Sequence, residues 1–209
     1  MTPLLLLGEG AALEQAQRTA HDCGLDHACL QLTSADHYNF DLGDLLAGYA
    51  ADATEVFVAL DERAVNHARH KLLADVRLAG YRTIDLVSPH AHVDAGVRLM
   101  GNVHVGPGCN LASGTRIGPG SWLERQVIVE QDVRLGACVT LHAGVHLGRG
   151  TQIGQGSTLG SGSMTRANSN IGRHCEWLLP GLMPEALPER SFHDALMPEG
   201  ARIFTGTHA

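Results

Sequence analysis

The sequence predicts a small α/β domain followed by an all-β parallel β-helix, and two patterns carry this prediction. From Val87 to Glu176 the chain repeats every six residues without a slip, and the first position is Val, Leu or Ile in fourteen of fifteen repeats, with Thr165 the exception. The fifth position is always small or β-branched. Before Val87, short apolar runs alternate with helical patterns, which is typical of a parallel sheet covered by helices.

The first 86 residues contain the expected α/β domain. Four leucines precede Gly8-Glu9-Gly10, and a helical pattern follows, which predicts a strand, a tight turn and a helix. The expected strands are residues 4–7, 56–60 and 83–87, and the expected helices are about 11–21 and 64–79. Because ligands bind beyond the carboxyl ends of parallel strands, Gly8, Gly10, Asp61 and Arg63 are the candidate substrate-binding residues. The segment GEGAALEQ is not a full dinucleotide fingerprint, and a plain strand-to-helix turn is the alternative.

Residues 87–177 form the expected β-helix domain. Three six-residue steps close one triangular coil, so the repeats give about five coils whose aliphatic residues point inward. Residues eighteen apart then stack, which places His142 over Glu124 and Gln131 between Ser113 and Arg149. One outward column is expected to contain His104, Trp122, Thr140 and Thr158. Glycines at the second and fourth positions are expected to supply backbone freedom at the corners.

Residues 178–209 are expected to form a C-terminal extension. Trp177 takes the next inward position after the last repeat and is expected to plug the end of the prism. Pro180, Pro184 and Pro188 argue against regular strands nearby, and residues 189–196 are expected to form a short helix. The tail then covers the last coil, crosses to a neighbouring subunit, or is loosely ordered.

Composition excludes several classes of protein. The net charge is −7 and no basic stripe is present, which argues against nucleic acid as the main partner. No segment is long and apolar enough to span a membrane, and the start lacks a basic signal-peptide region, so a cytoplasmic location is expected. The five cysteines show no metal-ligand spacing and are expected to be packed thiols.

The α/β domain joined directly to hexapeptide repeats, through the junction GYRTIDLVSPHAHV, resembles the PglD/NeuD-type sugar acyltransferases over about residues 3–176. The resemblance implies a left-handed β-helix, a homotrimer, and transfer of an acetyl group from acetyl-CoA to an amino or hydroxyl group of a sugar, often nucleotide-linked. It also implies that the α/β domain holds the nucleotide sugar and that acetyl-CoA lies along the β-helix between two subunits. The candidate donor contacts in this chain are Thr140, Gly144 and Gly162.

The position of the relatives' catalytic histidine departs from the family pattern. That histidine falls in the repeat VEQDVR, where this chain has Gln131-Asp132 and keeps Glu130. A glutamine side chain cannot take a proton at any useful pH, so another group must act as base or none does. His142, oriented by Glu124, is one candidate base, and an amine acceptor that arrives neutral is a second solution. The candidate catalytic residues are therefore His142, Glu130 and Gln131.

Three further alternatives remain open at this point. The chain is a non-catalytic relative that binds a nucleotide sugar or CoA, or serves as a trimeric scaffold, if the missing histidine abolished catalysis. A metal held by His142, His146 and a histidine of another subunit is a minor alternative, and no metal is expected. Arg98, Arg116 and Arg134 form an outward column that receives CoA phosphates, pairs with a neighbour's carboxylates, or is simply solvated.

Overall fold

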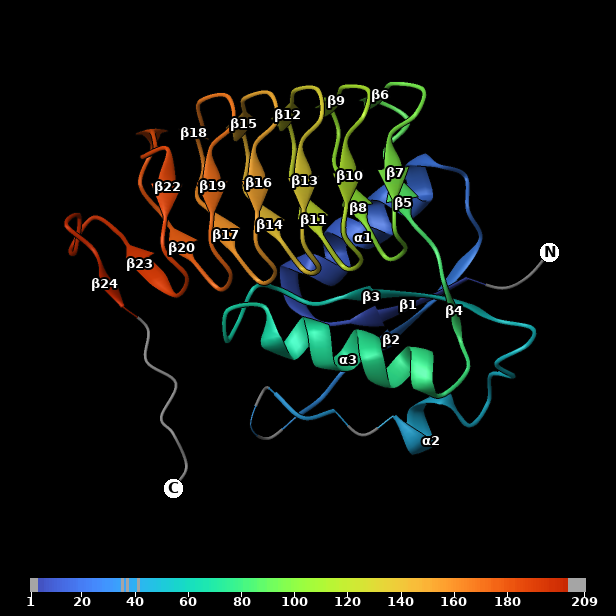
Figure 1. Ribbon diagram of the computed structural model, residues 1–209. Coiled ribbons are helices and arrows are strands. Elements are labelled where there is room, and N and C mark those ends of the chain that lie inside the picture. The colour runs from blue at the N-terminus through green and yellow to red at the C-terminus, as the bar shows by residue number, and fades with distance from the viewer. Residues whose placement is uncertain (1–3, 35, 37, 41, 203–209) are drawn as a thin grey trace.

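The computed structural model describes residues 4–34, 36, 38–40 and 42–202. A small α/β domain lies beneath a solenoid of stacked three-sided coils, and helix α1 lies between the small sheet and the coils (Figure 1). The elements of the α/β domain are β1 (Leu4–Gly8), α1 (Gly10–Asp22), β2 (His27–Gln31), α2 (Gly43–Leu46), β3 (Glu55–Ala59), α3 (His67–Leu78) and β4 (Arg82–Thr83). Its four strands are parallel in the order β2-β1-β3-β4.

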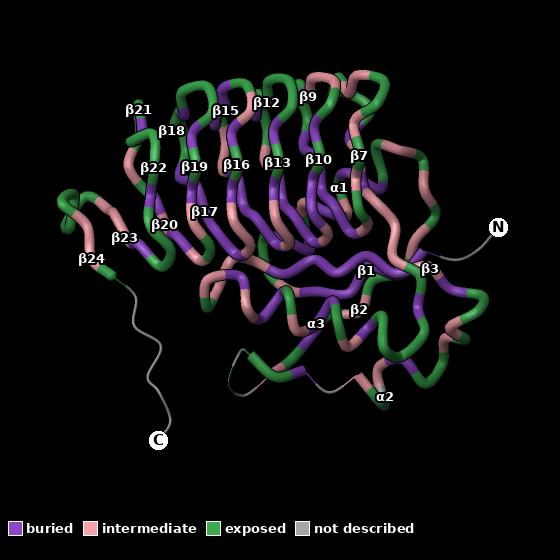
Figure 2. Tube along the Cα trace, in the orientation of Figure 1, coloured by how far each residue is buried: buried purple, intermediate pink, exposed green. Residues whose placement is uncertain are grey.

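Both faces of the small sheet are buried, which explains the unbroken apolar run in β1. Leu5 and Leu7 pack into a cluster with Leu72 of α3, whereas Leu4 and Leu6 pack on the other side with residues of α1. Strands that are covered on both faces need no polar alternation. Figure 2 shows that the residues of β1 and β3 are buried along most of the length of both strands.

Three sequence expectations for this domain need correction. Strand β2 (His27–Gln31) was not predicted, because it is an edge strand with no fully buried residue and therefore has a weak apolar pattern. Helix α3 begins at His67 instead of 64, because residues 64–66 have positive φ angles of 51°, 54° and 61° and form a left-handed turn. The expected strand 83–87 divides into β4, in the small sheet, and the first solenoid strand.

The solenoid has three faces, and each face is a β-sheet whose strands are parallel except for the last one, β24. The first, which we call the docked sheet, contains β5 (Leu86–Val87), β8 (His104–Val105), β11 (Trp122–Leu123), β14 (Thr140–Leu141), β17 (Thr158–Leu159), β20 (Glu176–Trp177), β23 (Ser191–His193) and the antiparallel β24 (Ala201–Arg202). The second, the open sheet, contains β6 (His92–Val93), β9 (Asn110–Leu111), β12 (Ile128–Val129), β15 (His146–Leu147), β18 (Ser163–Met164) and β21 (Gly181–Leu182). The third, the arginine sheet, contains β7 (Arg98–Leu99), β10 (Arg116–Ile117), β13 (Arg134–Leu135), β16 (Gln152–Ile153), β19 (Asn170–Ile171) and β22 (Ala186–Leu187).

The register confirms the predicted stacking at eighteen residues. Arg116 pairs with Arg98 and Arg134, and Trp122 pairs with His104 and Thr140. The first-position aliphatics and the fifth-position small residues fill one continuous core, in which Trp177 takes the predicted inward position with 7% exposure. The expectation that Trp177 plugs the end of the prism is wrong, because β23 stacks beyond it.

The coils continue beyond the last recognised repeat. Strands β21, β22 and β23 follow Trp177, so the expectation that prolines exclude strands there is wrong, and the helix expected at 189–196 is wrong because Ser191–His193 is a strand. Each coil needs only two extended residues per face. Pro180, Pro184 and Pro188 therefore fit in the corners between strands, where no ladder hydrogen bond is lost.

The glycines of the repeat serve two different purposes, and the sequence prediction recognised one. Gly96, at a fourth position, has φ +88° and lies in open space, so it supplies the left-handed corner as expected. Gly118, at a second position, does not have a left-handed φ. A Cβ there would lie 2.3 Å from the carbonyl oxygen of Gly136, so glycine is needed for the close approach of successive coils.

We expect Gly118→Ala to destabilise the protein more than Gly96→Ala. The first substitution forces two coils apart and should cost about 3 kcal/mol, the upper end of the usual cost of overpacking. The second adds only the strain of a left-handed alanine, about 1–2 kcal/mol. Urea unfolding of the two variants measures the difference, and an equal loss would contradict this account of coil packing.

Candidate active site between the two domains

The α/β domain docks on a column of outward side chains from the solenoid. His104, Trp122, Thr140 and Thr158 point away from the solenoid core, yet each is at most 4% exposed because helix α1 and the turn before α3 cover them. Trp122 Nε1 donates to Gln15 Oε1 at 3.2 Å, and Thr158 Oγ1 accepts from Asn66 Nδ2 at 3.0 Å. Buried polar groups that are hydrogen-bonded in this way fix the relative position of the two domains.

His104 forms the α1 side of this contact. Its ring stacks on Trp122 at 4.2 Å between centroids, and its Nε2 lies 3.0 Å from Thr19 Oγ1. Burial lowers the pKa of His104 to about 4, so the ring is neutral at physiological pH. Both ring nitrogens are already engaged, Nδ1 with the carbonyl of Leu123 and Nε2 with Thr19 Oγ1, which makes His104 a structural residue.

Arg69 and Asn66 form the α3 side of the contact, and each is 1% exposed. Arg69 donates from Nη1 to the carbonyl of Leu60 at 3.0 Å and from Nη2 to Thr140 Oγ1 at 2.6 Å, and it also contacts Asn66 Oδ1. Its Nε, however, has no hydrogen-bond partner. Burial without a directly bonded carboxylate lowers the pKa of Arg69.

Asn102 links the solenoid to the middle of strand β3. Its Oδ1 accepts from the backbone N–H of Val58 at 2.7 Å and its Nδ2 donates to the carbonyl of Val58 at 2.9 Å. These two bonds replace the pairing that the short strand β4 does not provide beyond Val56, so the carboxyl end of β3 is held against the first coil.

His142 is held between carboxylates from both domains. Its Nδ1 lies 3.3 Å from Glu124 Oε1 on the neighbouring coil, as the stacking predicts, and its Nε2 lies 3.5 Å from Glu62 Oε1 after β3. The hydrogen bond with Glu124 raises the pKa of His142 above its usual value against the opposing effect of burial, and Glu62 adds to the rise. The same contact lowers the pKa of Glu124.

Glu62 was not among the predicted site residues, because its contact with His142 depends on how the two domains dock. No spacing within either domain reports that distance. The one available signal was its place directly after Asp61, at the carboxyl end of a parallel strand, where ligand-binding residues gather.

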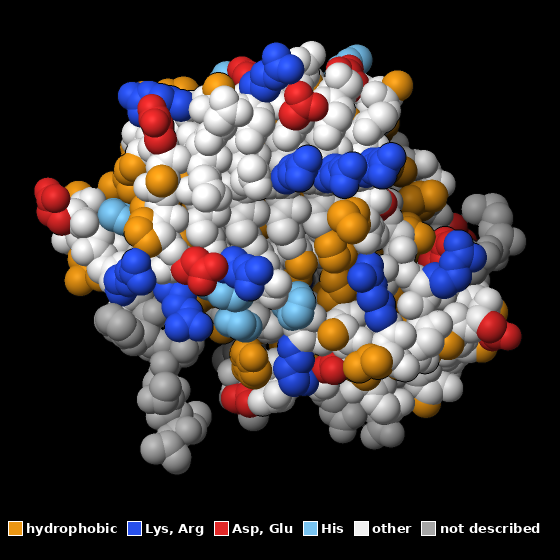
Figure 3. Space-filling model, viewed as in Figure 1, with side chains coloured by type: hydrophobic (Ala, Val, Ile, Leu, Met, Phe, Trp, Pro, Cys, Tyr) orange, Lys and Arg blue, Asp and Glu red, His pale blue; other side chains and the backbone are white. Residues whose placement is uncertain are grey.

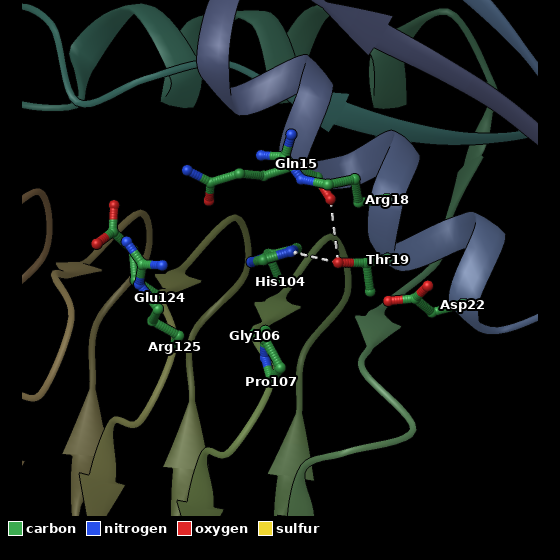
Figure 4. A pocket seen from close by; sticks show the side chains of 9 residues that line it. All are labelled: Gln15, Arg18, Thr19, Asp22, His104, Gly106, Pro107, Glu124 and Arg125. Atoms are coloured by element: carbon green, nitrogen blue, oxygen red, sulfur yellow. Dashed lines mark hydrogen bonds between the residues drawn. The ribbon is translucent and has the colours of Figure 1, made fainter.

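A cavity of about 280 Å³ surrounds this contact, and we call it the reaction cavity. Among the residues that line it are Gln15, Asp61, Glu62, Arg69, Glu124 and His142. A second cavity, of about 320 Å³, shares Asp61 and Glu62 and extends to Arg63 and Glu176. A third, of about 250 Å³, shares Gln15 and Glu124 and lies between α1 and the coils, where Figure 4 shows Arg125 next to Glu124 and His104 facing Thr19 of α1. The three cavities follow the line where the domains meet.

Glu130 and Gln131 do not lie beside His142 in this chain. They lie in the corner that follows β12, whereas His142 lies in the corner that precedes β15, at the opposite ends of the strands of the open sheet. Glu130 instead contacts His146 Nε2 at 3.0 Å and accepts from the backbone N–H of Arg149 at 2.8 Å, and these contacts lower its pKa. The exposed Gln131 side chain makes no hydrogen bond to the described part of the chain.

The four candidate substrate residues meet at the end of the small sheet, as expected. Gly8 lies so close to β3 that a Cβ would be 1.9 Å from the carbonyl oxygen of Ala59, and Gly10 has φ +57°. Arg63 donates to both oxygens of Asp61, at 2.6 and 2.7 Å, and also forms an ion pair with Glu9. Two carboxylates thus face the charge of Arg63, and they raise its pKa.

The three candidate donor contacts have different environments. Thr140 is 1% exposed and its hydroxyl is bonded to Arg69 and Asn66, so we do not assign it a contact with the donor. Gly144 and Gly162 lie one above the other on an exposed corner beside His142. Their N–H groups already donate to the previous coil, at 3.1 and 3.0 Å, so these glycines offer a strip free of side chains.

Two outward columns remain exposed on the other faces of the solenoid. The arginine sheet presents Arg98, Arg116 and Arg134 as a row that crosses the coils (Figure 3), and none of the three forms an ion pair with a residue that the structure describes. The open sheet presents Ile128, Met164 and Leu182, which are 43%, 40% and 51% exposed.

Two other kinds of feature are absent from the part of the chain that the structure describes. No group of three or more His, Cys, Asp or Glu side chains in residues 4–34, 36, 38–40 and 42–202 has the arrangement of a metal site. Within the same ranges, none of the helices combines the length and the apolar character needed to cross a bilayer.

Comparison with known proteins establishes the fold. No protein-family model and no curated protein matches the chain. Among solved structures, the acetyltransferase domain of PglB from Neisseria gonorrhoeae superposes with a TM-score of 0.81 at 19% identity over 92% of this chain and 96% of that one. Its complex with acetyl coenzyme A gives 0.79 at 19% identity over 91% and 95%. PerB from Caulobacter crescentus, with CoA and GDP-perosamine, gives 0.61 at 23% identity over 91% and 92%. The chain thus has the predicted fold, a small parallel-sheet domain joined to a left-handed hexapeptide β-helix.

Proposed function

We propose that this protein transfers an acetyl group from acetyl-CoA to an amino or hydroxyl group of a sugar, most simply a nucleotide-linked one, in glycan biosynthesis. The observation that carries the proposal is His142, held between Glu124 and Glu62 in a cavity at the domain junction. The two similar proteins support the substrates, because one was solved with acetyl coenzyme A and the other with CoA and GDP-perosamine.

His142 is the general base in this proposal. Glu124 orients the ring through Nδ1, which leaves Nε2 directed toward the cavity and Glu62. Nε2 removes a proton from the acceptor, the acceptor atom bonds to the thioester carbonyl carbon, and the carbon–sulfur bond breaks. For a hydroxyl acceptor, His142 returns its proton to the departing thiolate, so the products are the ester and the CoA thiol.

The exposed corner beside His142 is the proposed place for the donor. Gly144 and Gly162 leave it without side chains over two coils, so an extended pantetheine arm can lie along it with its thioester toward His142. Arg98, Arg116 and Arg134 lie on another face, and we leave them without a role in donor binding.

We also propose that the protein is a homotrimer. Three exposed apolar side chains of the open sheet support this, because Ile128, Met164 and Leu182 would be covered, together with His146 of the same column, if three open sheets faced a common axis. Such an axis brings the corner that contains Gln131 in one subunit toward the corner that contains His142 in the next subunit. Gln131 then orients the acceptor or donates a hydrogen bond, which are the roles open to an amide.

Light scattering on the purified protein tests the trimer. The expected mass is three times that of the 22.2 kDa chain. Met164→Glu should lower it, because a carboxylate would then be buried at the common axis. A mass of one chain for the unaltered protein would contradict the trimer.

A cytoplasmic location completes the proposal. All five cysteines are free, which fits a reducing compartment.

The second candidate function is a non-catalytic ligand-binding protein or trimeric scaffold, and the observation in its favour is Gln131 at the position where the resemblance expects the catalytic histidine.

We expect His142→Ala to lower kcat for acetyl transfer by about 10²–10⁴-fold, the usual contribution of a general base. Because His142 must be neutral to act and its pKa is raised, kcat/KM should fall as the pH drops through a value above 6.5. His21→Ala is the matched control, because His21 is an exposed residue at the end of α1 that lines none of the three cavities, and it should leave kcat within a few-fold. Unchanged turnover in His142→Ala would remove His142 as the base, and no turnover in the unaltered protein would favour the scaffold.

A further inference from the structure

The arginine sheet presents a row of three positive charges that the proposed reaction does not use, and we call it the arginine ladder. Arg98, Arg116 and Arg134 are direct neighbours in the sheet, and all three are exposed (Figure 3). Adjacent strands lie about 4.8 Å apart, so the three charges follow one another at that spacing. Because like charges directly opposite each other destabilise a sheet, the ladder does not stabilise the fold.

The nearest carboxylates do not neutralise the ladder. Glu130 and Asp132 lie in the corner that leads into the strand of Arg134. Asp132, however, lies 3.4 Å from Arg149 Nη2, and Glu130 lies 3.0 Å from His146 Nε2. None of the three ladder guanidinium groups forms an ion pair within the part of the chain that the structure describes. The ladder therefore keeps its positive charge on a protein whose net charge is −7.

The same outward column continues without charge beyond the ladder. Gln152 follows Arg134, Asn170 follows Gln152, and Ala186 follows Asn170. An open groove of about 600 Å³ begins at Arg134 and is lined by Gln152, Asn170 and the glycines of the following corner. The whole column has five steps of about 4.8 Å and is about 24 Å long, which is the length of a helix of about 16 residues.

The spacing of the ladder fits carboxylates on one face of an α-helix. Residues at i, i+4 and i+7 lie on one helix face, and at about 1.5 Å per residue they span about 10.5 Å. The ladder spans about 9.6 Å from Arg98 to Arg134. Three carboxylates on one face of an extended strand span about 13 Å, because alternate residues are about 6.7 Å apart. A helix therefore matches the ladder more closely than a strand does.

A single row of charges also argues against a bilayer as the partner. A membrane presents a plane of anionic headgroups, and the surfaces that bind it gather several Lys and Arg side chains across that plane. The remaining outward residues of this column, Gln152, Asn170 and Ala186, are uncharged. Glu130 and Asp132, beside the ladder, would be repelled by anionic lipids.

We propose that the arginine sheet is a docking surface for an acidic α-helix of another protein, which lies along the stack of coils with carboxylates at i, i+4 and i+7 over Arg98, Arg116 and Arg134. The rest of the helix lies over Gln152 and Asn170, whose amides accept uncharged polar partners. The ladder lies on a different face from the reaction cavity, so this partner anchors the protein and takes no part in acetyl transfer. The inference does not depend on the proposed function.

A synthetic helix tests the proposal directly. The probe is an alanine-rich peptide of about 16 residues, held helical by a lactam bridge, with Glu at i, i+4 and i+7 and a fluorine label. Its ¹⁹F line should broaden saturably when the unaltered protein is added at low salt, and added salt should reverse the broadening. The control peptide has its three Glu at i, i+2 and i+5, on different faces, and should bind at least about threefold more weakly.

Variants of the central arginine test whether the ladder itself is the contact. Arg116→Gln should weaken binding of the probe about two- to fivefold, the usual effect of one exposed ion pair. Arg18→Gln, the same change of charge on α1, is the control and should leave binding unchanged. Arg116→Glu should abolish binding, and a probe with Lys in place of its middle Glu should restore it. Both Arg116 variants change an exposed side chain and relieve repulsion within the ladder, so the fold should tolerate them.

Four results would overturn the inference, and none of them would contradict acetyl transfer. No broadening with either peptide would leave the ladder without this partner. Equal broadening with both peptides would show a diffuse attraction in place of a docked helix. Sedimentation of the unaltered protein, but not of Arg116→Gln, with phosphatidylglycerol vesicles would assign the ladder to a membrane surface. A weaker calorimetric affinity for acetyl-CoA in Arg116→Gln would assign the ladder to the donor.

Discussion

The candidate site depends on the docking of the α/β domain onto one face of the solenoid. His104, Trp122, Thr140 and Thr158 would be ordinary solvated residues on an isolated β-helix, but here each is buried and bonded to the other domain. Two further bonds cross the interface, from Asn102 to the carbonyl of Val58 and from Arg69 to the hydroxyl of Thr140. These contacts hold Glu62, at the end of β3, within reach of His142, on a solenoid corner. Since neither domain alone contains Glu62, Glu124 and His142 together, a displacement at the interface would separate these side chains.

Electrostatics then decides what the site can do. A histidine between two carboxylates is easier to protonate than a free one, so the proposed base is stronger and its activity depends on a higher pH. The end of the small sheet is different, because Glu9 and Asp61 already face Arg63. An anionic group placed there would be repelled by these two carboxylates, which already neutralise the charge of Arg63. The site therefore favours neutral or cationic chemistry near His142, in keeping with the net charge of −7.

Much of the fold could be predicted from the sequence, because the six-residue repeat is a local signal with a single structural solution. The same register placed His142 over Glu124, since stacking at eighteen residues follows from the repeat alone. Three features could not be predicted. Strand β2 lacks a buried residue, the prolines after Trp177 fit corners that need no ladder hydrogen bond, and residues 64–66 turn left-handed before α3. Glu62 and Arg69 reach the site only through domain docking, which no local pattern encodes. For the same reason Thr140 looked like a donor contact on an outward column, whereas the interface uses its hydroxyl.

The measurement that tests this account most directly is the binding of acetyl-CoA by titration calorimetry, with free CoA as the control. The account predicts saturable binding at one site per subunit with micromolar affinity, because the corner beside His142 must hold the donor before transfer. Absence of binding at millimolar acetyl-CoA would contradict a CoA-dependent acyltransferase and leave the fold with a different donor or with no catalytic role.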